Sequence, residues 1–77
     1  MPTSGRNIPL KSFRDYLEWK GLKKIRTKGS HEIWSKNDLS RSIIVQSHID
    51  PVPLFVVKTN LKTLGVTIRD YEEFLLS

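Results

Sequence analysis

The middle third of the chain contains three short β-favouring segments in succession, and this feature constrains the fold more than any other. Residues 22–28 and 31–36 are separated by a glycine-containing turn. A polar turn then leads into residues 41–47, the run richest in β-favouring residues. Strands that follow one another across short turns usually pair with their neighbours. The three segments therefore predict an antiparallel sheet of three strands.

Helical patterns flank this central region on both sides. Residues 10–20 carry apolar side chains at the spacing of one helix face, between a proline and a glycine. Residues 54–64 show the same spacing after a proline-containing turn, again ending before a glycine. A third, shorter helix is expected to begin at Thr67, where Asp70 takes the place of the usual glutamate in a capping box.

The length of 77 residues leaves room for one hydrophobic core. Residues 1–8 carry turn formers without periodicity, so we expect a flexible N-terminal tail followed by a single domain over residues 9–77. The predicted fold class is α+β, in the order α-β-β-β-α-α, with the helices on one face of the sheet. The other sheet face is then free for a partner.

Several classes of protein are disfavoured by composition. No apolar run is long enough to cross a bilayer, and the N-terminal residues do not resemble a signal peptide. The chain has no cysteine, which excludes disulfides and thiolate metal sites and fits a reducing compartment. Two histidines are too few for a three-histidine metal site. We therefore expect a cytoplasmic protein without a membrane partner, a metal or another cofactor.

The positive charge is concentrated in the first part of the chain. Residues 1–30 carry eight Lys and Arg residues against two acidic ones, a net charge of +6, whereas residues 31–77 carry five against six, a net charge of −1. A basic segment beside a near-neutral one is expected of a protein that binds phosphates on one face. The alternative is a solvated basic surface that maintains solubility.

Two histidines occupy positions near the ends of predicted strands. His31 follows the turn at Gly29 and Ser30 and comes directly after the basic run, so we expect it at the solvent-exposed rim of the sheet. An ordinary surface histidine that hydrogen-bonds to the backbone is the alternative. His48 ends the third predicted strand, and a turn residue that caps its own backbone is the simpler interpretation there.

The tryptophans and the C-terminal segment suggest further ways to bind nucleic acid. Aromatic rings stack on unpaired bases, although packing in a core is more common. We expect Trp19 in the core and leave both roles open for Trp34. Residues 61–71 resemble a helix-turn-helix. Its second helix carries three carboxylates against one arginine, which disfavours contact with DNA phosphates.

Residues 26–34, Arg-Thr-Lys-Gly-Ser-His-Glu-Ile-Trp, resemble the HicA family of toxins, small messenger-RNA interferases of bacterial toxin–antitoxin pairs. The Gly-Ser-His step is the family's signature, and the broader resemblance covers residues 9–76. Two features depart from the family pattern. Gln46 stands where a proline is common, and Val-Pro-Leu-Phe at residues 52–55 replaces the usual Gly-Thr step that opens the helix.

This resemblance implies a double-stranded-RNA-binding-domain-like fold, α-β-β-β-α, here with a short further helix at the C-terminal end. It also implies a metal-independent endonuclease that hydrolyses messenger RNA and is silenced by a HicB-like antitoxin protein. Carried over to this chain, the catalytic role falls on His31, with Gly29 and Ser30 shaping its turn.

The same role follows from the chemistry of RNA. RNA supplies its own nucleophile, the 2′-hydroxyl, so an enzyme has to take one proton, hold the phosphate and neutralise charge on the phosphoryl oxygens. We expect His31 to be the general base, and Lys28 and Arg26 to hold the phosphate. Lys23 and Lys24 extend the basic RNA-binding face.

Two other functions stay open at this point. A non-catalytic RNA-binding module would use the same basic face, with His31 only donating a hydrogen bond. A helix-turn-helix DNA-binding protein would act through residues 61–76. An auxiliary part for His48 in catalysis also stays open.

Overall fold

The computed structural model describes residues 8–77. The helices and strands follow in the order α1 (Leu10–Trp19), β1 (Lys23–Lys28), β2 (His31–Ser35), β3 (Ile43–Gln46), α2 (Leu54–Leu64) and α3 (Ile68–Leu76). This confirms the predicted α+β class and the predicted order of elements. The ends of the strands differ from the predicted ends by at most two residues, because the residues nearest the turns do not pair.

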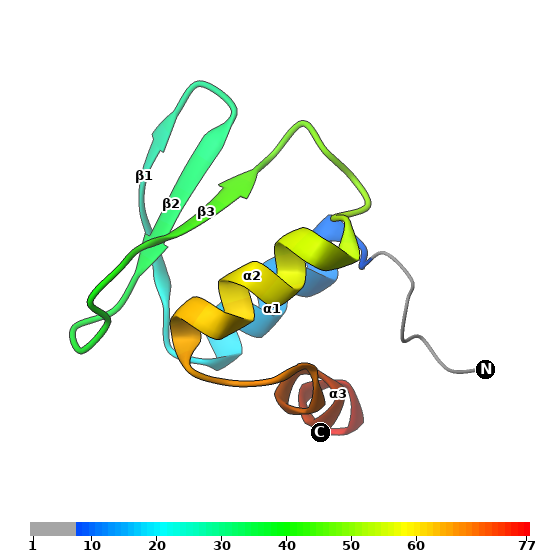
Figure 1. Ribbon diagram of the computed structural model, residues 1–77. Helices are drawn as coiled ribbons and strands as arrows, with labels where there is room; N and C mark the ends of the chain where they lie inside the picture. The colour runs from blue at the N-terminus through cyan, green and yellow to red at the C-terminus, as the bar shows by residue number, and fades with distance from the viewer. Residues whose placement is uncertain (1–7) are drawn as a thin grey trace.

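The three strands form one antiparallel sheet in the order β1-β2-β3. Figure 1 shows α1 and α2 on the same side of this sheet, with α3 beyond them and away from the strands. No helix of the described part of the chain covers the opposite side, which we call the open face. The sheet therefore has one face in the core and one face toward solvent, as its alternating side chains require.

The core lies between the sheet and the helices. In β2, Glu32 and Trp34 are buried, and in β3, Ile43 and Val45 are buried, so alternate residues of both strands face the helices. The helices complete this core with one apolar stripe each. The fully buried side chains from the helices are Phe13, Tyr16, Leu17, Val57 and Leu61.

Helix α3 is joined to α1 by polar and aromatic contacts. The Tyr16 hydroxyl donates to Asp70 Oδ2 at 2.6 Å, and Lys20 Nζ lies 3.0 Å from the same oxygen. Tyr71 packs edge-on against the Tyr16 ring, with 5.4 Å between the ring centroids. Burial, followed by the bond to Asp70, raises the pKa of Tyr16 above its usual value.

Three expectations from the sequence need correction. Ile8, assigned to the tail, is 5% exposed and forms a bridge with Val52, because its apolar side chain extends the core. Trp19 is 47% exposed at the end of α1, where it contacts the Phe74 ring. Thr67 makes no side-chain capping bond in the described structure, because the Asp70 N–H donates to the Thr67 carbonyl and the Asp70 carboxylate is engaged by α1. The rest of the predicted tail, residues 1–7, lies outside the described residues.

No helix within residues 8–77 combines the length and the apolar character needed to cross a membrane.

Candidate functional site

His31 is the first residue of β2 and is exposed to solvent. It follows a two-residue turn, Gly29 and Ser30, that connects β1 to β2. Gly29 has φ +59°, and no residue other than glycine within residues 8–77 has positive φ. Glycine at the first central position and negative φ at the second are the pattern of a type II′ turn. The Gly-Ser step of the sequence therefore builds the tight turn that presents His31.

The strand register sets the neighbours of His31. Lys28 of β1 lies opposite His31, and Gln46 of β3 lies opposite it on the other side. Residues directly opposite one another in a sheet project to the same face, with Cβ atoms about 4.5–5.5 Å apart. The next residue, Glu32, is buried toward the helices, so alternation directs His31 to the open face. Lys28, His31 and Gln46 therefore form one row across the open face.

A β-bulge decides which basic side chains join this face. Lys24 pairs with Trp34 and Arg26 pairs with Ile33, which leaves Ile25 as the extra residue. If pairing continued regularly from Lys24, Thr27 would lie opposite His31. The bulge instead brings Lys28 to that position.

The predicted basic residues consequently divide between the two faces. Arg26 and Lys28 belong to the open face by register, as does Lys23, which pairs with Ser35. Lys24 pairs with the buried Trp34 and so belongs to the opposite side. There it lines a groove between α1 and β1 together with Arg14, Glu18, Gly21, Leu22, Lys23, Glu32 and Trp34. Lys23, at the start of β1, borders this groove as well, so Arg26 and Lys28 are the predicted basic side chains that lie with His31 on the open face alone.

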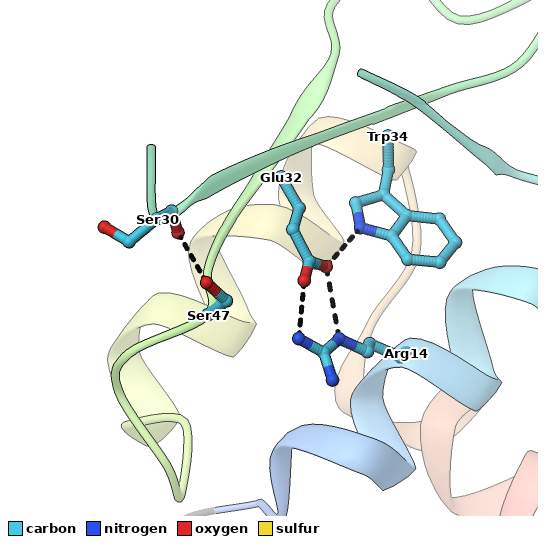
Figure 2. Close-up of polar contacts among 5 residues, drawn as sticks. All are labelled: Arg14, Ser30, Glu32, Trp34 and Ser47. Atoms are coloured by element: carbon cyan, nitrogen blue, oxygen red, sulfur yellow. Dashed lines mark hydrogen bonds and ion pairs between the residues drawn. The ribbon is translucent and has the colours of Figure 1, made fainter. Parts of the chain in front are cut away.

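The turn before His31 is held by the end of β3. The backbone N–H of Ser47 donates to the Ser30 carbonyl at 2.7 Å, and the Ser47 hydroxyl donates to the same oxygen at 3.0 Å. Figure 2 shows the hydroxyl contact. Ser30 and Ser47 are both half-buried. Sequence reasoning did not identify Ser47, because its contact with Ser30 depends on the pairing of β2 with β3.

The residue after His31 is held from the helix side. Arg14 of α1 donates from Nε to Glu32 Oε1 at 3.1 Å and from Nη2 to Oε2, and Trp34 Nε1 donates to Oε1 at 3.1 Å (Figure 2). Burial favours the neutral form of Glu32, but these bonds and the charges of Arg14 and Lys24 outweigh it and lower its pKa. In the sequence, the one feature that pointed to Glu32 was its spacing of two residues from Trp34 in the same predicted strand, which places both side chains on one face.

The second histidine lies outside the row. His48 is exposed in the turn that follows β3, two residues beyond Gln46. The strand pairs of the described residues do not include it. The register thus pairs His31 with Lys28 and Gln46 and leaves His48 in a different segment.

The two tryptophans do not lie on the open face. Trp34 is 3% exposed, and its indole nitrogen donates to Glu32 in the core. Trp19 is exposed at the end of α1 beside α3, and Lys20 Nζ lies 5.8 Å from its ring centroid. The apolar side chains that the register places on the open face are aliphatic instead, Ile33 and Ile44, and Ile44 is the more exposed of the two.

The residues that the structure describes contain no cluster of three or more His, Cys, Asp or Glu side chains able to hold a metal ion. Comparison of the chain with models of protein families, with curated proteins and with solved structures gave no match.

Proposed function

We propose that this protein is a metal-independent endoribonuclease that cleaves messenger RNA, with His31 as general base and the open face of the sheet as the RNA-binding surface. One observation carries the proposal: the register aligns exposed His31 with Lys28 and Gln46 on a sheet face that no described helix covers. The resemblance of residues 26–34 to the HicA signature supports the same assignment.

The reaction needs only groups that this row and the RNA supply. Neutral His31 takes the proton of a ribose 2′-hydroxyl, and the resulting oxygen attacks the adjacent phosphorus. The bond from O2′ to phosphorus forms while the bond from phosphorus to O5′ breaks, and the leaving 5′-oxygen takes a proton from solvent. The products are a 2′,3′-cyclic phosphate and a 5′-hydroxyl. His31 returns to its neutral form by releasing its proton.

Charge on the phosphoryl oxygens grows during this attack, and the basic side chains of the open face oppose it. Lys28, directly opposite His31, is the nearest cation by register, and Arg26 follows on the same face. Lys23 continues the series toward the other end of β1. Gln46 adds an amide group that both donates and accepts hydrogen bonds on the β3 side of His31.

Substitution of the base tests the proposal directly. We expect His31→Ala to lower the cleavage rate of an RNA oligonucleotide by ~10²–10⁴-fold, the usual contribution of a positioned base, while RNA affinity changes little. The rate is measured by gel analysis of end-labelled RNA with a chelator present, and the product ends are identified by mass spectrometry. His48→Ala is the matched control and should cleave at the parent rate.

Three results would reject the proposal. They are loss of parent cleavage on adding the chelator, full activity of His31→Ala, and an inactive parent that still binds RNA. The third result would favour the non-catalytic RNA-binding module.

The division of basic residues between faces gives a second test. Lys28→Ala should weaken RNA binding equally across sequences and reduce the slope of log affinity against log salt by about one, because one phosphate contact is lost. Lys24→Ala removes the same charge from the same strand but from the helix side, so the slope should stay near that of the parent. Both slopes are measured by fluorescence anisotropy with a 2′-deoxy analogue of the RNA, which binds but lacks the hydroxyl needed for cleavage. Equal slopes in the two variants would contradict RNA binding on the open face.

The proposal extends to the biological setting. A nuclease that cleaves messenger RNA harms the cell that makes it unless it is silenced, and a HicB-like antitoxin protein in a type II toxin–antitoxin pair would silence it in the cytoplasm. Induction of the parent protein should arrest growth, and induction of His31→Ala should not.

A further inference from the structure

The backbone around His31 is held at both neighbouring residues, by different means. Glu32 is locked on the helix side by Arg14 and Trp34. Ser30 is held by Ser47, whose N–H and hydroxyl both donate to the Ser30 carbonyl, at 2.7 and 3.0 Å. That carbonyl belongs to the peptide group that connects Ser30 to His31. Two donors on one oxygen restrict rotation of this peptide plane, which sets the direction of the His31 Cα–Cβ bond.

This restriction matters because His31 occupies a weak place in the sheet. It is the first residue of β2, directly after a turn, and β3 ends at Gln46, opposite it. Strand ends open more readily than strand centres. A general base has to stay within hydrogen-bond reach of the proton it takes, and a displacement of 1 Å can cost ~10²-fold in rate. The hydrogen bonds from Ser47 to the Ser30 carbonyl therefore restrain the backbone at the end of the strand, where strand pairing restrains it least.

We propose that Ser47 is a positioning residue for the His31 base, acting through the Ser30 carbonyl. The inference rests on the proposed ribonuclease function and extends it to a residue outside the Gly-Ser-His signature. The Ser47 hydroxyl donates its hydrogen to Ser30, so its role is orientation of His31 rather than proton transfer to RNA.

Ser47→Ala removes one donor and keeps the other, since the backbone N–H is unchanged. We expect the cleavage rate at saturating RNA to fall about tenfold, a fraction of the cost of a full 1 Å displacement, with unchanged affinity for a 2′-deoxy analogue. Ser47→Thr keeps the hydroxyl and should recover most of the rate. Ser42→Ala is the matched control, because exposed Ser42 flanks the opposite end of β3.

A second measurement does not depend on activity. Three-bond nuclear magnetic resonance couplings between the amide and α protons of His31 report its backbone φ angle, which changes when the Ser30–His31 peptide plane rotates. We expect a single φ value in the parent and averaging over several values in Ser47→Ala. Thermal unfolding of both proteins separates this local effect from a loss of folding.

The outcomes distinguish the two proposals. Parent cleavage together with full activity of Ser47→Ala would overturn the role of Ser47 and leave the ribonuclease standing. If the parent protein does not cleave RNA, the proposed function fails. The couplings then show by themselves whether the contact from Ser47 to Ser30 restrains the backbone of His31. Averaging in Ser47→Ala alone would support the contact, and identical couplings in both proteins would overturn it.

Discussion

At the scale of single residues, Glu32 shows how a charge is accommodated in a small core. A buried carboxylate without partners costs several kcal/mol, so its two oxygens must be paired. Arg14 and Trp34 provide three hydrogen bonds, and the side chain of Glu32 is only 5% exposed. The Arg14 side chain is 36% exposed, so solvent weakens the ionic part of this pair. The contact links β2 to α1 immediately beside His31.

Glu32→Gln tests the importance of this contact. The substitution keeps the shape of the side chain but removes its charge. It also replaces one acceptor oxygen with an NH2 group that faces another donor, so we expect the free energy of unfolding to fall by about 1–3 kcal/mol. Urea denaturation measures the change. Glu18→Gln, at an exposed position of α1, should change it by less than about 0.5 kcal/mol. Similar losses in the two variants would contradict the account.

At the scale of elements, the beginning of α1 depends on a residue far away in the sequence. Pro9 precedes the helix and contributes no side-chain cap to the described structure. Asp50, in the turn between β3 and α2, accepts a hydrogen bond from the Leu10 N–H at 3.0 Å. A carboxylate at a helix N-terminus satisfies an unpaired N–H and interacts favourably with the helix dipole. The turn that follows the sheet thus stabilises the first helix.

Asp50→Ala should lower the free energy of unfolding by about 0.5–2 kcal/mol, the usual cost of losing a cap. Asp50→Asn keeps an acceptor oxygen and should lose less. Thermal or urea unfolding of the three proteins ranks them. An alanine variant as stable as the parent would show that solvent replaces the cap at no cost.

At the scale of the whole molecule, we expect the attachment of α3 to α1 to depend on pH. The hydrogen bond from Tyr16, and then the bond and charge of Lys20, lower the pKa of Asp70 against the opposing effect of burial. A carboxyl group with a lowered folded-state pKa stabilises the fold fully above its ordinary value, 3.8 for Asp70. This contribution is lost as the pH falls through the folded-state pKa. Glu32, with an ordinary value of 4.5 and a lowered pKa, acts in the same direction.

We therefore expect the parent to lose stability as the pH is lowered from 6 toward about 3, where such carboxylates take up protons. Asp70→Asn removes one of these groups, so its free energy of unfolding should fall less over the same range. Urea midpoints at several pH values measure both curves. Parallel curves would show that Asp70 does not contribute to the acid sensitivity.

Local patterns were sufficient to predict much of the fold. Apolar spacing predicted α1 and α2, and the β-favouring runs predicted three strands, because these periodicities depend on neighbours within a few residues. The turn at Gly29 and Ser30, with His31 directly after it, was also readable from the chain. The predicted tail was too long by Ile8, since its burial depends on Val52, a residue of another segment.

Local sequence patterns account for the order of elements, the concentration of basic residues in and before β1, and a histidine at a strand end beside them. Which of those residues share a surface depends on how the strands pair in the folded protein. Lys24 faces the helices while Lys28 flanks His31, because the bulge at Ile25 changes the phase of β1. Ser47 holds Ser30 because β3 pairs with β2. Phase and pairing are properties of strands in contact, and one residue of register changes the face of every side chain that follows.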